Sequence, residues 1–194
     1  MNISEQSELG ACGTLPGVNV RLILIDPDTD SEDLVRFLAS NRFPFHVVEE
    51  LHEADARARV TSGVFSQPEN AAYWIESDGA RVGFLNFQEL LDGTPMIDMR
   101  LAEERRGQGI GTLALGMGTS QVFTEHPSIN RIEGNTRADN GAMRKVFGEN
   151  RYVKEAHYRD GWTVAGAEPV DSVAYAIIRR DWVTGSITPV DWNA

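Results

Sequence analysis

The sequence EERRGQGIGTLAL, residues 103–115, joins an apolar, strand-like run to a helical pattern through three glycines at alternate positions. Gly107, Gly109 and Gly111 let successive backbone N–H groups converge, and the N-terminus of the following helix adds partial positive charge. The preceding Arg106 brings a full positive charge. The pattern predicts an anion-binding loop between a strand and a helix, although the same glycines would also suit a plain tight turn.

Two nucleotide-binding motifs can be tested against this loop by residue identity. A P-loop requires a lysine directly after its last glycine, whereas Gly111 is followed by Thr112. A dinucleotide fingerprint has the spacing Gly-x-Gly-x-x-Gly, whereas this loop has Gly-x-Gly-x-Gly, and the first strand of the chain does not lead into it. The sequence excludes both motifs.

Apolar periodicity elsewhere predicts strands and helices in the order β-α-α-β-β-β-α-β-α-β-β. Strands are expected over 18–27, 73–76, 82–90, 95–102 and 130–136, and in the segments YVKEAHYRDGWTV and DSVAYAIIRRDW. Helices are expected from the capping residue Thr29 to Pro44, over 51–63, from Ile110 to Pro127 and after Asn140. Because hairpins require antiparallel pairs and single-helix crossovers favour parallel ones, the expected fold class is α/β (α+β) with a mixed sheet.

The length of 194 residues indicates one domain. We expect an irregular leader over 1–17, the domain over 18–182 and an irregular tail over 183–194. No stretch of the sequence approaches the roughly 18 consecutive apolar residues of a membrane helix. Residues 1–17 lack the basic start and apolar middle of a signal peptide. We therefore expect a cytoplasmic protein with no membrane partner.

The chain is acidic, with 29 acidic and 18 basic residues and a net charge of −11. Nucleic-acid binding depends on clustered cations, so this charge disfavours a nucleic-acid partner. It suits a cationic or amine substrate better, although net charge concerns solubility first. The four histidines, His46, His52, His126 and His157, lack Glu or Cys partners at metal-ligand spacing, so no metal site is expected.

Leu101 followed by AEERRGQGIG resembles the GNAT superfamily of acetyl-CoA-dependent N-acetyltransferases. The family signature Arg/Gln-x-x-Gly-x-Gly/Ala is met by Arg106, Gly109 and Gly111. Asn140, which opens a later helix, and the final strands resemble the RimJ/RimL-like branch. The resemblance implies a mixed, mostly antiparallel sheet of six to seven strands with splayed central strands, flanked by about four helices.

The resemblance also implies acetyl-CoA as co-substrate and no metal. It places the pantetheine arm along the end of the strand at Leu101 and the pyrophosphate on the backbone amides of the glycine loop. Asn140 would contact the pantetheine side, and a plain helix N-cap is an equally open role for it. The implied cofactor residues are Met99, Arg100, Leu101, Arg106, Gly107, Gln108, Gly109, Ile110, Gly111, Thr112, Asn140 and Phe147.

The residues that move protons depart from the family pattern. Phe147 stands where many members have a tyrosine acid, and Met143 stands where the RimJ/RimL-like branch often has a serine. Tyr152 and Tyr158 are the remaining candidates for the acid.

A glutamate that some members use as general base would fall at Asn135, which cannot act as a base. The candidates for the general base are Glu133, two residues earlier on the same strand face, and Asp98 on the preceding strand. Each could instead be an ordinary surface or ion-paired carboxylate. Trp162 is a candidate for lining the acceptor cleft.

The expected reaction is transfer of an acetyl group from acetyl-CoA to a primary amine by direct attack in a ternary complex. The acceptor would be a protein N-terminal α-amine or a small molecule, and family analogy suggests a homodimer. Two alternatives stay open: a different acyl-CoA donor, and a non-catalytic acyl-CoA-binding or sensory domain.

Overall fold

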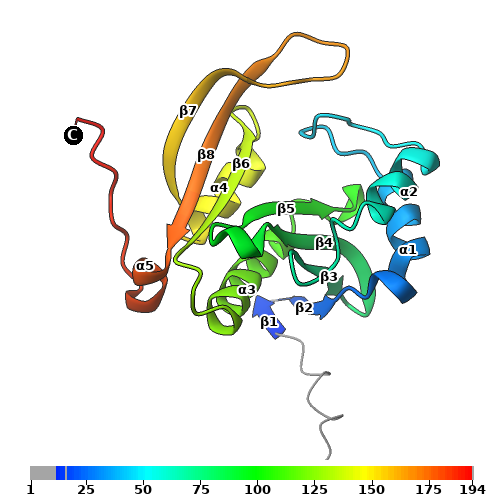
Figure 1. Ribbon diagram of the computed structural model, residues 1–194, viewed down its shortest axis with the longest axis horizontal. Coiled ribbons are helices and arrows are strands. Elements are labelled where there is room, and N and C mark those ends of the chain that lie inside the picture. The colour runs from blue at the N-terminus through cyan, green and yellow to red at the C-terminus, as the bar shows by residue number, and fades with distance from the viewer. Residues whose placement is uncertain (1–11, 16, 194) are drawn as a thin grey trace, which may run out of the picture.

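The central feature of the fold is an eight-stranded sheet, seen in the computed structural model, which describes residues 12–15 and 17–193 (Figure 1). The strand order is β1-β2-β3-β4-β5-β6-β8-β7, and all neighbours are antiparallel except β5 and β6, which are parallel. The strands are β1 Cys12–Leu15, β2 Val18–Leu24, β3 Ala71–Ser77, β4 Ala80–Gln88, β5 Met96–Leu101, β6 Arg131–Arg137, β7 Val153–Trp162 and β8 Val170–Ile178. The predicted mixed α/β class is confirmed, although the described residues form eight strands and five α-helices where six to seven strands and about four helices were expected.

Helices cover both faces of the sheet, with α3 and α4 on one face and α1 and α2 on the other (Figure 1). The helices are α1 Pro27–Ser40, α2 Glu53–Thr61, α3 Ile110–Glu125, α4 Gly141–Glu149 and α5 Arg179–Thr184. None of those in the described part of the chain has the length and apolar character needed to cross a membrane.

Side-chain alternation along each strand gives the two faces separate apolar clusters. In β3, Tyr73 and Ile75 belong to the cluster beneath α3, whereas Ala72 and Trp74 belong to the cluster beneath α1 and α2. Burial on both faces explains why β3 reads as an unbroken apolar run.

The parallel pair at the centre of the sheet separates almost at once. β5 and β6 are in register only at Met96 and Glu133, where the Glu133 backbone N–H donates to the Pro95 carbonyl at 2.9 Å. Beyond this point the two strands diverge, as Figure 1 shows. The predicted splaying is therefore present, and it leaves one edge of β5 open in the middle of the fold.

Helix α1 begins earlier than the sequence pattern indicates. Its N-cap is Asp26 rather than Thr29, and the Asp26 carboxylate accepts a hydrogen bond from the Asp28 backbone N–H at 3.0 Å. Pro27 occupies the first helical position, where its missing N–H is not needed.

The predicted leader and tail both contain regular structure. Residues 12–15 form β1, which covers the edge that β2 would otherwise expose; residues 1–11 and 16 lie outside the described part. The last strand stops at Ile178, and Arg179–Thr184 are helical. The Arg179 guanidinium fixes this turn by donating at 2.7 Å to three carbonyls, those of Phe123, His126 and Ile129.

Replacing Gly134 in β6 by alanine should destabilise the fold. An added Cβ would lie 2.4 Å from Cζ of Phe147, whose ring is stacked on Tyr175 with centroids 5.0 Å apart. We expect this overpacking to lower the free energy of unfolding by about 1–3 kcal/mol in denaturant titrations. Gly148→Ala in exposed α4 is the matched control, because nothing lies within 4 Å of a Cβ there. An equal loss in both variants would contradict the packing argument.

Candidate active site

The glycine loop presents a row of free backbone amides. Gly107 and Gly109 have φ of +72° and +81°, a left-handed conformation that favours glycine. Gly109 is the N-cap of α3, and the first helical hydrogen bond runs from the Leu113 N–H to its carbonyl. Within the described residues, no amide from 107 to 112 donates to a protein acceptor. These amides and the helix N-terminus together form a cradle suited to an anion.

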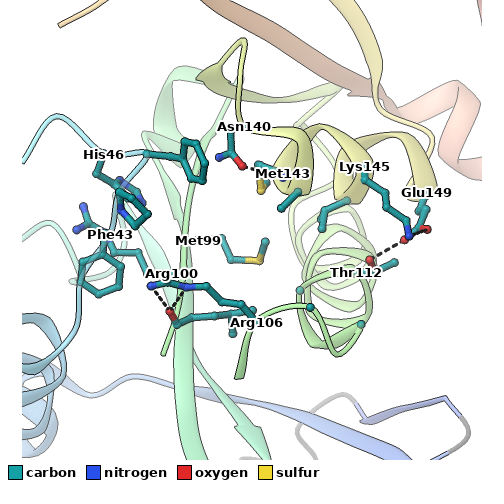
Figure 2. A pocket seen from close by; sticks show the side chains of 18 residues that line it. Phe43, His46, Met99, Arg100, Arg106, Thr112, Asn140, Met143, Lys145 and Glu149 are labelled. Carbon is teal, nitrogen blue, oxygen red and sulfur yellow. Dashed lines mark hydrogen bonds and ion pairs between the residues drawn. The ribbon is translucent and has the colours of Figure 1, made fainter. Parts of the chain in front are cut away.

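A cavity of about 280 Å³ lies beside this cradle (Figure 2). Its walls come from the glycine loop, the end of β5, the first turns of α4 and the segment 43–46 between α1 and α2. Nine of the expected cofactor residues line it: Met99, Arg100, Leu101, Arg106, Gly107, Gly109, Gly111, Thr112 and Asn140. We call it the donor cavity.

Three expected cofactor residues do not line the donor cavity. Ile110 is buried in the core, and the Gln108 side chain donates to the Glu104 carbonyl at 2.9 Å. Phe147 is 1% exposed and packs on Tyr175, and it borders a different cavity. The sequence did not indicate several residues that do line the donor cavity, including Phe43, His46, Lys145 and Glu149, because other elements bring them there.

Arg106 holds the loop in place through its guanidinium. Its Nε and Nη2 donate to the Leu101 carbonyl at 3.1 and 3.0 Å, and Nη2 also donates to the Arg42 carbonyl. Asn140 likewise uses both side-chain groups within the protein. Its Oδ1 accepts from the Met143 N–H at 3.1 Å, and its Nδ2 donates to Thr136 Oγ1 at 2.9 Å. The N-cap role left open for Asn140 is therefore observed.

The open edge of β5 supplies two further backbone donors. Ala102 donates its N–H to Val82 on the β4 side at 2.8 Å. Because backbone groups alternate sides along a strand, the N–H groups of Met99 and Leu101 point the other way, into the gap between β5 and β6. A ligand carbonyl oxygen in this gap could accept hydrogen bonds from these two N–H groups.

A second cavity of about 420 Å³ lies on the other side of Met99. It shares six residues with the donor cavity: Phe45, His46, Met99, Arg100, Asn140 and Met143. Its remaining walls come from the loop 47–51, α2, the end of β4, β5, β6, α4 and the end of β7, which contributes Trp162. We call it the acceptor cavity.

Asp98 lies in the acceptor cavity as part of an ion cluster. Its carboxylate pairs with Arg59 Nη2 at 2.7 Å and with Arg100 Nε at 3.2 Å. Burial alone would raise the pKa of Asp98, but the charges of Arg100, His46 and Arg59 outweigh burial and hold the pKa below its usual value. The carboxylate is held by two guanidinium groups, and these ion pairs compete with a substrate proton for its oxygen atoms.

The other expected proton-transfer residues line neither cavity. Glu133 pairs with Arg131 at 3.1 Å. Tyr152 is buried, its hydroxyl is 2.8 Å from Thr119 Oγ1, and burial raises its pKa. Tyr158 is exposed on β7. Neither the carboxylate nor the two phenols is placed to exchange a proton with a group at the junction of the cavities.

His46 is the titratable residue that the sequence analysis missed. It lines both cavities, and its ring contacts Phe43 edge-on with centroids 5.8 Å apart (Figure 2). Burial and the charge of Arg100 lower its pKa from 6.5 to about 4, so the imidazole is neutral near pH 7. In the described ranges, no group of three or more His, Cys, Asp or Glu side chains could hold a metal ion.

Comparison with known families identifies the class of protein. The family described as "Acetyltransferase (GNAT) domain" matches residues 21–153. The chain therefore belongs to the GNAT acetyltransferase family and is an N-acetyltransferase that uses acetyl-CoA. A comparison with curated protein sequences finds no significant match.

Solved structures share the fold at low sequence identity. Mycobacterium smegmatis RimJ in complex with CoA-disulfide has a TM-score of 0.71 and 22% identity, over 91% of this chain and 90% of that chain. A Salmonella typhimurium acetyltransferase that modifies the N-terminal serine of ribosomal protein L7/L12 has a TM-score of 0.66 and 20% identity, over 83% and 94%. The Vibrio cholerae spermidine/spermine N-acetyltransferase SpeG, in mutant forms, has a TM-score of 0.68 and 14% identity, over 86% and 99%.

Gly109→Asp should abolish acetyl-CoA binding because it places a carboxylate in the anion cradle. Gly109→Asn is the matched control, since asparagine has nearly the same shape and tolerates the left-handed conformation. Calorimetry should show that the aspartate variant loses at least about tenfold more affinity than the asparagine variant, which corresponds to about 1.4 kcal/mol. Equal affinities for acetyl-CoA would mean that the loop does not bind the phosphates.

Stability should fall as the pH is lowered from 6.5 to about 4, the interval between the ordinary and the folded-state pKa of His46. In this interval the unfolded chain takes up a proton that half-buried His46 does not, so protons favour unfolding. Below about pH 4 both states carry the proton and this contribution to the slope ends. Denaturant unfolding across the interval should show a shallower fall for His46→Gln, and identical slopes would contradict the burial of a neutral imidazole.

Proposed function

We propose that the chain transfers an acetyl group from acetyl-CoA to an amine by direct attack in a ternary complex. The observation that carries this proposal is the meeting of two cavities at Met99, on the open edge of β5. The donor cavity adjoins the anion cradle, and the acceptor cavity reaches the same strand edge from the other side. Two substrates can therefore meet without a protein nucleophile between them. A purely sensory domain would not need the acceptor cavity.

The residues around the donor cavity fit coenzyme A. The free amides of 107–112 suit the pyrophosphate, and the strand edge at Met99 and Leu101 suits the pantetheine arm. Lys145, which pairs with Glu149 at 3.6 Å at the same cavity, adds a cation for a phosphate group. The co-substrate supplies an activated thioester. The N–H groups of Met99 and Leu101 would stabilise the negative charge that develops on its carbonyl oxygen.

His46 is the proposed proton acceptor. Attack by the amine nitrogen forms the new C–N bond, the C–S bond breaks with its electron pair on sulfur, and the amine proton moves to a ring nitrogen of His46. The neutral imidazole at the junction of the cavities supports this role, whereas the Asp98 and Glu133 carboxylates are held in ion pairs. Neither Phe147 nor Met143 can donate a proton, so water in the donor cavity would protonate the thiolate.

The names of two structural neighbours support an amine as the acceptor. The Salmonella typhimurium neighbour modifies a protein N-terminal serine and the Vibrio cholerae neighbour is named for spermidine and spermine. Both groups are amines, which supports an amine acceptor for this chain. The homodimer, the cytoplasmic location and the choice of acyl chain remain predictions.

His46→Gln should lower kcat/KM for acetyl transfer by about 10²–10⁴-fold, the usual contribution of a general base. Its affinity for acetyl-CoA should fall less than that of Gly109→Asp, because the glycine loop is untouched. His52→Gln is the matched control, since His52 is exposed at the start of α2 and lines neither cavity. Thiol release by the two variants measures the effect; equal rates in His46→Gln and in the parent would remove His46 as proton acceptor.

A further inference from the structure

The acceptor cavity carries an excess of positive charge. Two guanidinium groups, Arg59 and Arg100, and one carboxylate, Asp98, are the charged side chains that line it. The whole chain has a net charge of −11, so this local excess opposes the overall charge. A cationic cavity repels a polycation and attracts an anion. The cationic substrate suggested by composition is therefore not supported at the place where the substrate would bind.

Two buried donors of this cavity have no acceptor. The Arg59 Nε–H and the Trp162 Nε1–H lack a hydrogen-bond partner among the described residues. Arg59 comes from α2 and Trp162 from the end of β7, so the fold places two side chains that are distant in sequence on the wall of one cavity. A buried donor without a partner is destabilising, because it has lost its hydrogen bond to water and gained none in the protein. The described part of the chain provides no acceptor for either group, although both side chains line the cavity.

We propose that the acceptor is a small amine that carries a carboxylate, and that this carboxylate binds Arg59 and Trp162. The inference rests on the proposed acetyl transfer and names its substrate class. A guanidinium is planar and matches the geometry of a carboxylate, and the Arg59 ion pair with Asp98 involves only Nη2. The amine of such a molecule would then face β5.

The size of the cavity favours a small molecule. The Ala165 N–H, in the loop between β7 and β8, donates to the Val47 carbonyl, in the loop between α1 and α2, at 3.2 Å. Figure 1 shows both loops above β5 in the view. This bridge and Trp162 bound a space of about 420 Å³, which suits a metabolite-sized ligand better than the terminus of a folded protein.

A bound carboxylate would also improve the proton acceptor. The charged groups that act on His46 are Arg59 from α2, Asp98 and Arg100 from β5, and Arg106 from the glycine loop. Burial and this excess of cations disfavour the imidazolium. A substrate carboxylate beside Arg59 opposes the cations and raises the pKa of His46 toward the range in which a general base is effective.

Binding of matched pairs of ligands to the protein saturated with coenzyme A tests the proposal without requiring turnover. Each pair is an amino acid and the amine left when its carboxylate is removed, such as phenylalanine with phenethylamine and lysine with cadaverine. Calorimetry should show at least about tenfold tighter binding of the amino acid. No such preference in any pair, including no binding at all, overturns the proposal. So does tighter binding of spermidine, or of a C-terminally amidated peptide with a free N-terminus.

Three variants locate the carboxylate. Arg59→Gln should remove the preference, and Trp162→Phe, which deletes the N–H and keeps an aromatic ring, should reduce it severalfold. Arg57→Gln is the matched control, because Arg57 lies on the same helix, pairs with Glu32 and Glu53, and does not line the cavity. A preference that survives both Arg59→Gln and Trp162→Phe overturns the proposal. Carboxylate-selective binding without thiol release from acetyl-CoA would instead refute acetyl transfer and support the binding site.

Discussion

The early separation of β5 from β6 is the constraint on which the site depends. A sheet normally pairs every backbone group of a central strand, and unpaired groups in a fold interior are costly. Here the ladder between the two strands has one register pair, Met96 with Glu133, and then stops. The backbone donors of Met99 and Leu101 are left for a ligand. The glycine loop, α4 and the segment 43–46 enclose this open edge, so both cavities exist because the sheet is incomplete there.

The acceptor cavity carries an excess of positive charge, whereas the whole chain has a net negative charge. The charge of the cavity, not that of the whole chain, acts on a bound substrate. Removing buried charges from water is expensive unless they are paired, and Asp98 pairs with two guanidinium groups. One positive charge remains in excess at the acceptor cavity. Burial and that excess lower the pKa of His46, and the excess would also favour the neutral, nucleophilic form of an incoming amine. An acidic surface therefore says little about the chemistry inside the cleft.

The fold class could be predicted from local pattern, and the glycine loop of the donor side from local pattern together with the family resemblance. A strand, alternating glycines and a helix are adjacent in the chain, and their geometry follows from backbone conformation alone. Of the acceptor side, the sequence indicated Trp162 and Asp98 but not His46 or Arg59, because these residues come from separate elements and meet only after folding. The spacing of residues along the sequence does not show which residues of separate elements will meet. For the same reason Tyr152, near the site in sequence, was expected there, whereas its hydroxyl is buried against Thr119.

A crystal structure of the acetyl-CoA complex tests the central claim most directly. The account predicts the pyrophosphate on the amides of 107–112 and the thioester carbonyl oxygen within hydrogen-bond distance of the Met99 or Leu101 N–H. It also predicts His46 on the acceptor side of the acetyl carbon. A pyrophosphate bound elsewhere, or a thioester turned away from the open edge of β5, would contradict the account.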